Sequence, residues 1–123
     1  MTQVTEFGRM ADGAMVHAIA LRSETLAVRL LTLGAIVQSV RLDGVGHDLT
    51  IGAQDVAAYE GAMCYHGSLI APVVNRITGG AAMVAGQPAQ FEKNILGRHT
   101  LHSGAAGTQF KLWQLDSATP SGV

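Results

Sequence analysis

Three polar side chains in an otherwise apolar, glycine-rich part of the sequence suit a neutral ligand rich in hydroxyl groups: Asn75, Arg76 and His102. The amide of Asn75 and the guanidinium of Arg76 can each contact several oxygens, and the imidazole of His102 can donate or accept a hydrogen bond near neutral pH. Taken singly, each has a plainer interpretation. An Asn-Arg pair is commonly a turn beside a solvated charge, and a lone His is commonly structural. Only the pattern around them can decide.

A metal site is the first alternative, because His99 and His102 have the spacing His-x-x-His. On a strand, residues three apart point to opposite faces, so one ion could not meet both rings. On a helix they could meet, but Gly97 and Gly104 disfavour a helix. Neither cysteines nor carboxylates cluster nearby to complete a ligand set. We therefore expect no metal at this pair.

Other chemistries lack their signatures. The glycines of Gly79-Gly80 and those at 104 and 107 match neither dinucleotide nor P-loop spacing, and no Gly-x-Ser-x-Gly elbow is present. Cys64 is the only cysteine, so we expect no intrachain disulfide. We interpret Cys64 itself as a small buried hydrophobic residue. The remaining histidines, His17, His47 and His66, are interpreted as surface or structural residues.

Short strands have to position the candidate residues, because apolar runs are separated by Gly and Asp-Gly. Asp12-Gly13 predicts a tight turn, and residues 36–43 alternate with a period of two, apart from Gln38 on the apolar side. Asp55 caps the only expected helical turn, 55–59. Further strands are expected at 16–22, 26–33, from 49 to 51, in a hairpin of 81–84 and 89–92 around 85–88, and at 110–115, with Trp113 in the core. These short runs predict an all-β, antiparallel β-sandwich.

Composition limits the partners. The 123 residues suffice for one domain, 1–123, with 117–123 as a flexible tail or break point. Charged residues make up 14% and the net charge is −1, so we expect no nucleic-acid partner. We also expect no membrane, since no apolar run reaches the ~20 residues of a spanning helix. With one cysteine and no signal-peptide pattern, the expected location is cytoplasmic.

One series of residues has a distinctive order and spacing: Val74-Asn75-Arg76-Ile77, Gly79-Gly80, Asn94, Leu101-His102-Ser103-Gly104, Gly107 and Trp113. The series closely resembles the aldose 1-epimerase (galactose mutarotase) family, in which Ala-Asn-Arg-Ile precedes Gly, a hairpin, Asn, Leu-His-Gly-Gly and Trp. Similar residues lie upstream, at Phe7-Gly8, Leu33-Gly34-Ala35, Ile51-Gly52 and Tyr59. The resemblance covers nearly the whole chain and is specific between Tyr59 and Trp113.

The resemblance implies a mutarotase-type β-sandwich (supersandwich) and an isomerase activity. Such an enzyme interconverts the α and β anomers of a free aldose, a hexose or pentose, by acid/base ring opening without metal or redox cofactor. By resemblance, Asn75 and Arg76 bind sugar hydroxyls. His102 corresponds to the first of two active-site histidines, which contacts the sugar and assists proton transfer.

The family's second histidine, its sugar-binding Asp and its Glu base come later in the chain than any residue present here. The resemblance therefore implies the N-terminal part of a mutarotase-like domain, without the main acid and base. We expect a companion chain carrying the C-terminal half, or self-association that covers exposed strand edges.

Departures from the family pattern leave alternatives open. Ala71-Pro72 replaces a common Gly-Arg, Ser103 replaces a Gly, and Gly107-Thr108-Gln109-Phe110 loosens a Gly-Phe. A divergent enzyme acting on another sugar or glycoside remains an alternative. So do a non-catalytic carbohydrate-binding module and a β-sandwich interaction fragment whose three polar residues are inert.

Overall fold

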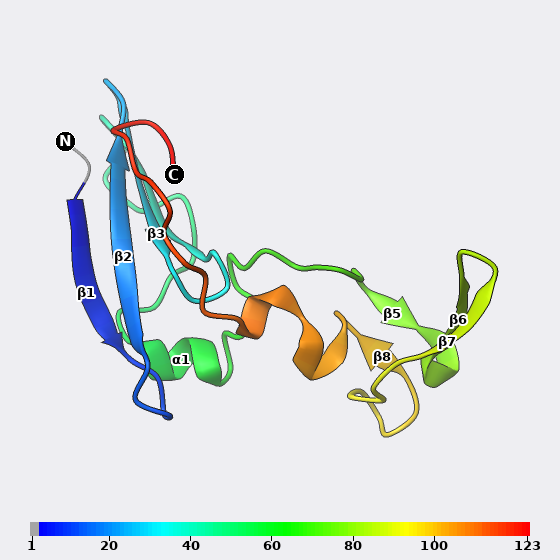
Figure 1. The fold of residues 1–123 in the computed structure, drawn as a ribbon. Helices are drawn as coiled ribbons and strands as arrows, with labels where there is room; N and C mark the ends of the chain where they lie inside the picture. Colours follow the sequence, from blue (N-terminus) through cyan, green and yellow to red (C-terminus); the bar gives the residue numbers. More distant parts are fainter. Residues whose placement is uncertain (1–2) are drawn as a thin grey trace.

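The computed structural model describes residues 3–123 as antiparallel β-structure with one short helix. Figure 1 shows a four-stranded sheet beside the helix, and an extension that carries the remaining short strands, between residues 76 and 101, away from the sheet. We call this extension the arm. In chain order the elements are β1 (Gln3–Arg9), β2 (Met15–Arg22), β3 (Leu26–Leu31), β4 (Val37–Leu42), α1 (Val56–Glu60), β5 (Arg76–Ile77), the 3-10 turn η1 (Thr78–Gly80), β6 (Ala81–Val84), β7 (Gln87–Gln90), β8 (Thr100–Leu101), and the 3-10 turns η2 (Gly104–Ala106) and η3 (Thr108–Phe110).

Strands β1 to β4 form one antiparallel sheet in sequence order. The predicted β1–β2 turn is confirmed: Gly13 takes a φ of +90°, and the N–H of Ala14 donates to the Asp12 carboxylate at 2.9 Å. The predicted strands 16–22 and 36–43 are confirmed as β2 and β4, within a residue or two. The run 26–33 is shorter than predicted, because β3 ends at Leu31 and the chain turns at Gly34.

The core lies where α1, which contacts β1, joins buried side chains of β2 and β3. The helix begins after Asp55, whose carboxylate accepts a hydrogen bond from the N–H of Ala58 at 2.9 Å, as predicted for an N-cap. The hydroxyl of Tyr59 accepts from the N–H of Ala53 at 2.8 Å, and burial raises the pKa of Tyr59. The buried cluster consists of Val16, Ala18, Leu31, Leu33, Ile36, Val56 and Tyr59.

Gln38, the exception in the predicted alternation of β4, is buried with an exposed fraction of 2%. Its Nε2 donates to the carbonyl of Ala53 at 2.9 Å, so the amide ties β4 to the segment that leads into α1. The predicted alternation holds at Ile36 and Gln38 but not at the end of β4, where Leu42 is 38% exposed. The buried amide of Gln38 is tolerated because its Nε2 has a backbone partner.

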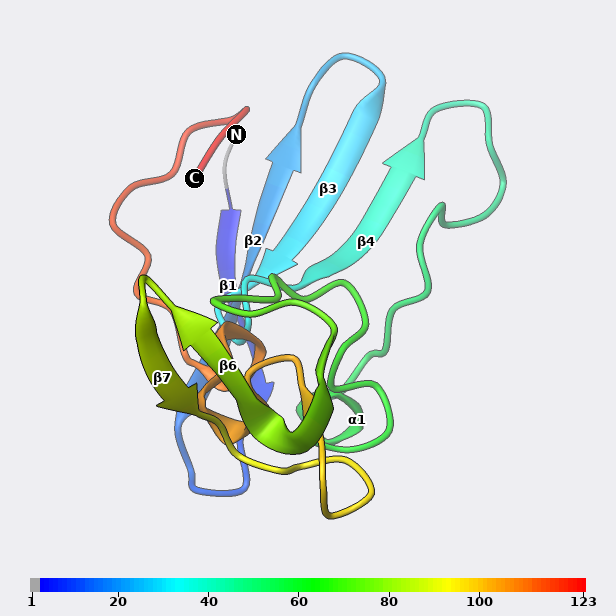
Figure 2. The same ribbon diagram turned by 90° about the vertical axis from the view of Figure 1, so that its right-hand side faces the viewer.

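The arm contains two ladders, β5 with β8 and β6 with β7 (Figure 2). The hairpin turn is two residues, Ala85-Gly86, rather than the predicted four. Their φ values of +48° and +78° place both in the left-handed region, which matches the twist of the flanking strands. Pro88 therefore lies within β7 opposite Met83, where a two-stranded ladder tolerates a missing N–H.

The predicted strand 110–115 is wrong. Phe110 ends η3, and Leu112 makes only an isolated bridge to Leu33. Trp113 is 41% exposed, so its predicted place in the core is also wrong. Here the N–H of Trp113 donates to the carbonyl of Thr32 at 2.7 Å, and no longer ladder forms.

Two other segments complete the fold. The strand predicted from 49 to 51 is absent from the described structure: Leu49 donates one backbone hydrogen bond to Val40 at 2.7 Å, and Ile51 is 76% exposed. The segment 117–123 returns to the end of β2, where the N–H of Arg22 donates to the carbonyl of Pro120 at 2.9 Å.

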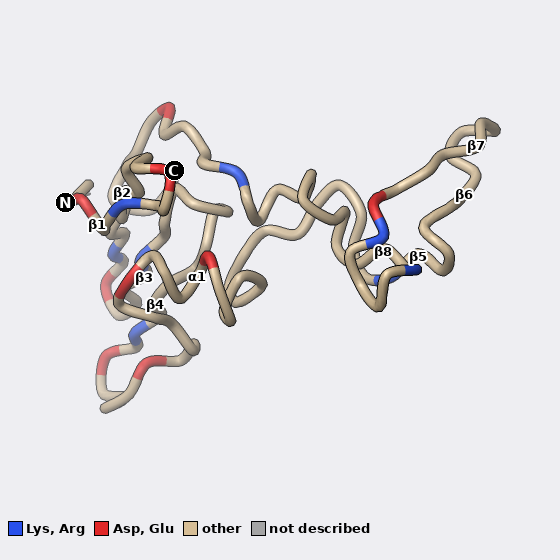
Figure 3. Tube along the Cα trace, turned by 90° about the horizontal axis from the view of Figure 1, so that it is seen from below, with Lys and Arg blue, Asp and Glu red and all other residues tan. Residues whose placement is uncertain are grey.

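The charged residues are dispersed over both parts of the fold, as Figure 3 shows. Across residues 3–123, no helix is long and apolar enough to cross a membrane.

Candidate functional site

The β5–β8 ladder brings the three candidate residues together. Arg76 pairs with Leu101 and Ile77 with Thr100, which places Asn75 opposite His102 at the end of the ladder. The backbone N–H of His102 donates to the carbonyl of Asn75 at 3.0 Å. Residues 27 positions apart in sequence are thus direct neighbours.

The imidazole of His102 is held by the same neighbour. The backbone N–H of Asn75 donates to His102 Nδ1 at 3.0 Å. Because Nδ1 acts as an acceptor, the neutral ring carries its proton on Nε2. The geometry therefore leaves an N–H donor on the side of the ring away from the ladder.

Arg76 joins the cluster through Asn75. Its Nη1 donates to Asn75 Oδ1 at 3.1 Å, and both residues are exposed. The amide is thus fixed next to the guanidinium, and its backbone is fixed to the imidazole. An amide, a guanidinium and an imidazole make one contiguous polar surface on the arm.

Asn94, which belongs to the series singled out in the sequence, supports the ladder. Its Oδ1 accepts from the N–H of Leu101 at 2.7 Å and its Nδ2 donates to the Leu101 carbonyl at 2.9 Å. A side-chain amide thus takes the place of a neighbouring strand on the open edge of β8. Asn94 holds the backbone that carries His102.

An aromatic side chain that the sequence pattern did not single out contacts His102. The ring of Tyr65 meets the imidazole edge to face with centroids 5.0 Å apart, and Phe110 follows at 6.2 Å from Tyr65. Burial raises the pKa of Tyr65, so its hydroxyl stays protonated at neutral pH. No periodicity could have identified Tyr65, because it comes from the irregular segment between α1 and β5.

The backbone at the site is held in an unusual conformation. Asn75, His102 and Ser103 have φ values of +65°, +49° and +66°, and these are half of the six non-glycine residues with positive φ in the described chain. Residues in this region carry a conformational cost and persist only where surrounding contacts determine them. The contacts on Asn75 and His102 therefore stabilise this costly backbone conformation.

Gln109 makes one of the contacts that hold the backbone of His102. It is 2% exposed, and its Nε2 donates to the carbonyl of His102 at 2.9 Å. Its own backbone carbonyl lies against Gly34 at the β3–β4 turn. Gln109 thus connects the sheet to the site, a role that its position in the sequence does not indicate.

The two histidines of the His-x-x-His motif have separate partners. His99 Nδ1 accepts from the N–H of Gly79 at 3.0 Å, whereas His102 Nδ1 accepts from Asn75. Within residues 3–123, no group of three or more His, Cys, Asp or Glu side chains is arranged to hold a metal ion.

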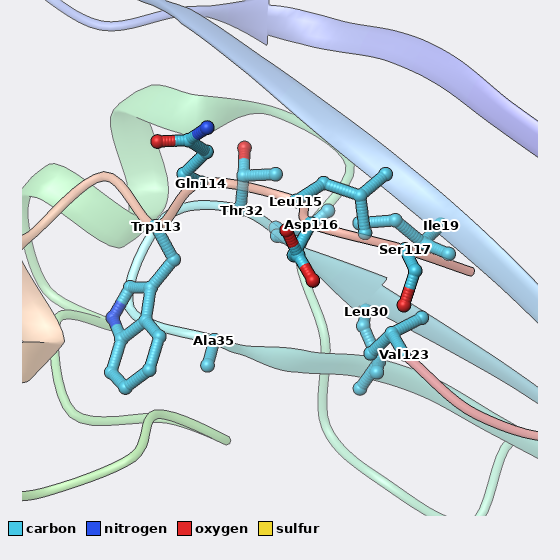
Figure 4. Close-up of a pocket in the computed structure, with 11 residues that line it drawn as sticks. Ile19, Leu30, Thr32, Ala35, Trp113, Gln114, Leu115, Asp116, Ser117 and Val123 are labelled. Atoms are coloured by element: carbon cyan, nitrogen blue, oxygen red, sulfur yellow. The ribbon is translucent and has the colours of Figure 1, made fainter.

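A separate, apolar recess of about 510 Å³ lies on the sheet (Figure 4). Ile19 and Leu30 form its floor, and the segment from Trp113 onward forms its wall. None of the three candidate residues lines it. The recess is therefore distinct from the polar cluster on the arm.

Comparisons with known proteins agree with the residue series. The family model for aldose 1-epimerase matches residues 17–123. A galactose mutarotase from Bos taurus is 28% identical over a match of 119 positions, which covers 92% of this chain and 34% of the relative. The crystal structure of a galactose 1-epimerase from Lactobacillus acidophilus NCFM superposes with a TM-score of 0.75 at 22% identity, over 92% of this chain and 33% of that one.

The chain spans about a third of the length of these relatives. Over that third, the structural likeness confirms the predicted antiparallel fold of the mutarotase type. Because the family model matches most of the sequence, the chain belongs to the aldose 1-epimerase family.

Proposed function

We propose that this chain supplies the sugar-binding residues and one active-site histidine of an aldose 1-epimerase (mutarotase). The observation that supports the proposal most strongly is the meeting of the exposed Asn75 and Arg76 with the half-buried His102. The combined donors and acceptors suit the alternating hydroxyls of a free hexose or pentose. The chain's membership of the family makes such a sugar the natural ligand.

Interconversion of anomers requires the sugar ring to open and to close on the other face. A base takes the proton of the C1 hydroxyl while an acid protonates the ring oxygen, and the C1–C2 bond rotates before the roles reverse. Each well-placed proton-transfer group contributes typically ~10²–10⁴-fold. Asn75 and Arg76 would hold the hydroxyls so that the anomeric carbon faces the acid and the base.

His102 would act through Nε2. With Nδ1 occupied by the N–H of Asn75, Nε2–H is the donor that can reach a sugar oxygen. In this orientation it stabilises negative charge on the ring oxygen as the ring opens and assists transfer of a proton to it. The main acid and base would come from elsewhere.

We therefore propose a companion chain that carries the C-terminal half with the principal acid and base. The alternative is self-association of this chain, which would cover its exposed strand edges without supplying those two groups. The isolated 123 residues should not equilibrate sugars quickly. Polarimetry on freshly dissolved α-glucose or α-galactose measures this, and rapid equilibration by the isolated chain would refute the need for a companion.

A divergent substrate is the second candidate, and a specific observation favours it. Ser103 and Pro72, which depart from the family pattern, lie beside the polar cluster, since the Ser103 hydroxyl contacts Val73. A pentose or glycoside could then be preferred over a hexose. A companion without a His and a Glu facing His102 would instead favour a non-catalytic carbohydrate-binding module.

Calorimetric titration with galactose, glucose and xylose tests the binding half of the proposal. Arg76→Ala should weaken the binding of the preferred sugar, because the guanidinium contacts are lost. Arg41→Ala is the matched control: Arg41 is an exposed arginine on β4, away from the arm. Equal affinity in all three proteins would leave the proposed site without support.

A further inference from the structure

The segment that leads into β5 makes a hydrogen bond to the segment 102–108 at every second residue. The N–H of Thr108 donates to the carbonyl of Ala71 at 2.9 Å, and the N–H of His102 donates to that of Asn75 at 3.0 Å. Between Ala71 and Asn75, Val73 forms hydrogen bonds with the side chain of Ser103. The spacing of two is that of a strand, but the opposing chain is not a strand here.

The Ser103 hydroxyl replaces the missing backbone partner. It accepts a hydrogen bond from the N–H of Val73 at 2.8 Å and donates one to the carbonyl of Val73 at 3.1 Å. A strand residue opposite Val73 would make the same two bonds with its own N–H and C=O. Ser103 is only 8% exposed, so water competes poorly for either bond.

This pair of hydrogen bonds lies between the segment that carries His102 and the segment that carries Asn75 and Arg76. Ser103 directly follows His102, and Val73 lies two residues before Asn75. Ser103 keeps a φ of +66° although it is not a glycine. The residue in this costly conformation is thus the one whose side chain makes the two hydrogen bonds to Val73.

We infer that Ser103 is a positioning residue that sets the spacing between His102 and the Asn75-Arg76 pair. Its hydroxyl holds the peptide of Val73, and this keeps the N–H of Asn75 in line with His102 Nδ1. The imidazole is thereby kept with its proton on Nε2, directed away from the ladder. The inference rests on the proposed function only for its consequence for sugar binding.

Two variants separate the hydroxyl from the backbone cost. Ser103→Ala removes the hydroxyl and keeps a Cβ at φ +66°, whereas Ser103→Gly removes the hydroxyl and adopts this φ without penalty. Ser23→Ala is the control, because the Ser23 hydroxyl accepts from the N–H of Leu26 at 3.2 Å in the β2–β3 turn. Should the Ala variant fail to fold, the Gly variant still tests the inference.

The first measurement uses the ligand-free chain. Nitrogen-15 NMR of the imidazole reports the tautomer of His102, and hydrogen exchange reports protection of the Asn75 N–H. Both Ser103 variants should populate the Nδ1–H tautomer and exchange the Asn75 amide roughly 3- to 10-fold faster, the effect of one net hydrogen bond. Ser23→Ala should leave both readouts unchanged. Unchanged tautomer and exchange in both Ser103 variants would overturn the inference.

The second measurement is the affinity for the preferred sugar. Ser103→Ala and Ser103→Gly should both bind it roughly 3- to 10-fold more weakly, even where the Gly variant melts at the higher temperature. A purely structural hydroxyl would instead give affinities that follow stability, which would contradict positioning. If the unmodified chain binds no sugar, the proposed function fails, while the ligand-free measurement still decides the role of Ser103.

Discussion

At the residue scale, His102 is restrained on its ring and on its backbone. Asn75 holds Nδ1 and the backbone N–H, Gln109 holds the carbonyl, and the ring of Tyr65 lies against the imidazole. A group that must present one nitrogen to a substrate gains from such restraint, because little freedom is lost on binding.

The contact between Tyr65 and His102 yields a prediction. Tyr65→Ala should lower sugar affinity severalfold, since aromatic pairs contribute about 0.5–1.5 kcal/mol beyond area burial and the imidazole would lose one wall. Tyr65→Phe keeps the ring and should bind as the unmodified chain does. Calorimetric titration of both variants checks this. A loss that is equal in the Phe and Ala variants would mean that the hydroxyl matters instead of the ring.

Asp48 gives a prediction about pH. Its carboxylate accepts from the Ser39 hydroxyl, and from the N–H groups of Val40 and Thr50 at 2.9 and 3.0 Å. Hydrogen bonding, first from Ser39 and then from Val40, lowers the pKa of Asp48. A lowered folded-state pKa stabilises the fold above the unfolded-state value of about 3.9, and this contribution disappears as pH falls through the folded-state value.

Asp48→Asn should therefore be less stable than the unmodified chain at pH 7, and the difference should shrink below about pH 4. Denaturant unfolding at a series of pH values measures it. Asp12→Asn is the control, since its Oδ1 acceptor in the β1–β2 turn is retained. A difference at position 48 that does not vary with pH would contradict the assignment.

At the element scale, the β3–β4 turn links the sheet to the site. The N–H of Gly34 donates to the carbonyl of Lys111 at 2.8 Å, and its carbonyl accepts from the N–H of Leu69 at 2.9 Å. Both segments lead directly into the loops that carry the polar cluster. Gly34 is thus one of the points at which the sheet is joined to these loops. The N–H of Val37 also donates to the carbonyl of Gly67 at 2.9 Å.

Gly34→Ala should be strongly destabilising. Gly34 has a φ of +61°, and an added Cβ would lie 2.6 Å from the carbonyl oxygen of Gln109. Gly44 has a φ of +82° with nothing near its Cβ position, so Gly44→Ala carries the backbone cost alone, about 1 kcal/mol. Gly34→Ala should cost a further ~1–3 kcal/mol for the steric conflict. Thermal unfolding compares them, and equal losses would contradict the close approach.

Local patterns predicted the sheet well. The β1–β2 turn, β2, β4 and the α1 cap follow from Asp-Gly chemistry, an apolar run, alternating residue types and capping, respectively, which are properties of neighbouring residues. The strand predicted at 110–115 fails because alternating apolar residues do not specify a partner strand. The hairpin turn was placed correctly but too long, since two positive φ values at 85–86 suffice.

The site was predictable only in part. Asn75, Arg76 and His102 were identified by their order in a family series, and the structure brings all three together. Their roles in sugar binding and catalysis stay predictions. Tyr65 and Gln109 were missed, because contacts between distant segments leave no periodic pattern. The double hydrogen bond of Ser103 spans 30 residues and could not be inferred from the sequence.

At the scale of the whole molecule, α1 packs near one end of the sheet, and the sheet also carries an apolar recess of about 510 Å³. Large apolar patches on a protein surface mark interaction sites. The chain spans about a third of the length of its relatives.

We expect the purified chain to associate with itself or with a companion polypeptide. Light scattering should give a mass above the 12.8 kDa of one chain, and native mass spectrometry should identify what is bound. Ile19→Ser and Leu30→Ser, in the floor of the recess, should reduce the association. A stable monomer without any bound polypeptide would contradict this expectation.

The central claim is that Asn75, Arg76 and His102 form one sugar site, and NMR titration of the isotope-labelled chain tests it most directly. With galactose or glucose, the account predicts saturable shifts of the Asn75 amide, the Arg76 guanidinium and the His102 Nε2 signals, with Trp113 in the recess unaffected. Shifts confined to Trp113 and its neighbours, or no saturable shift with any aldose, would contradict it.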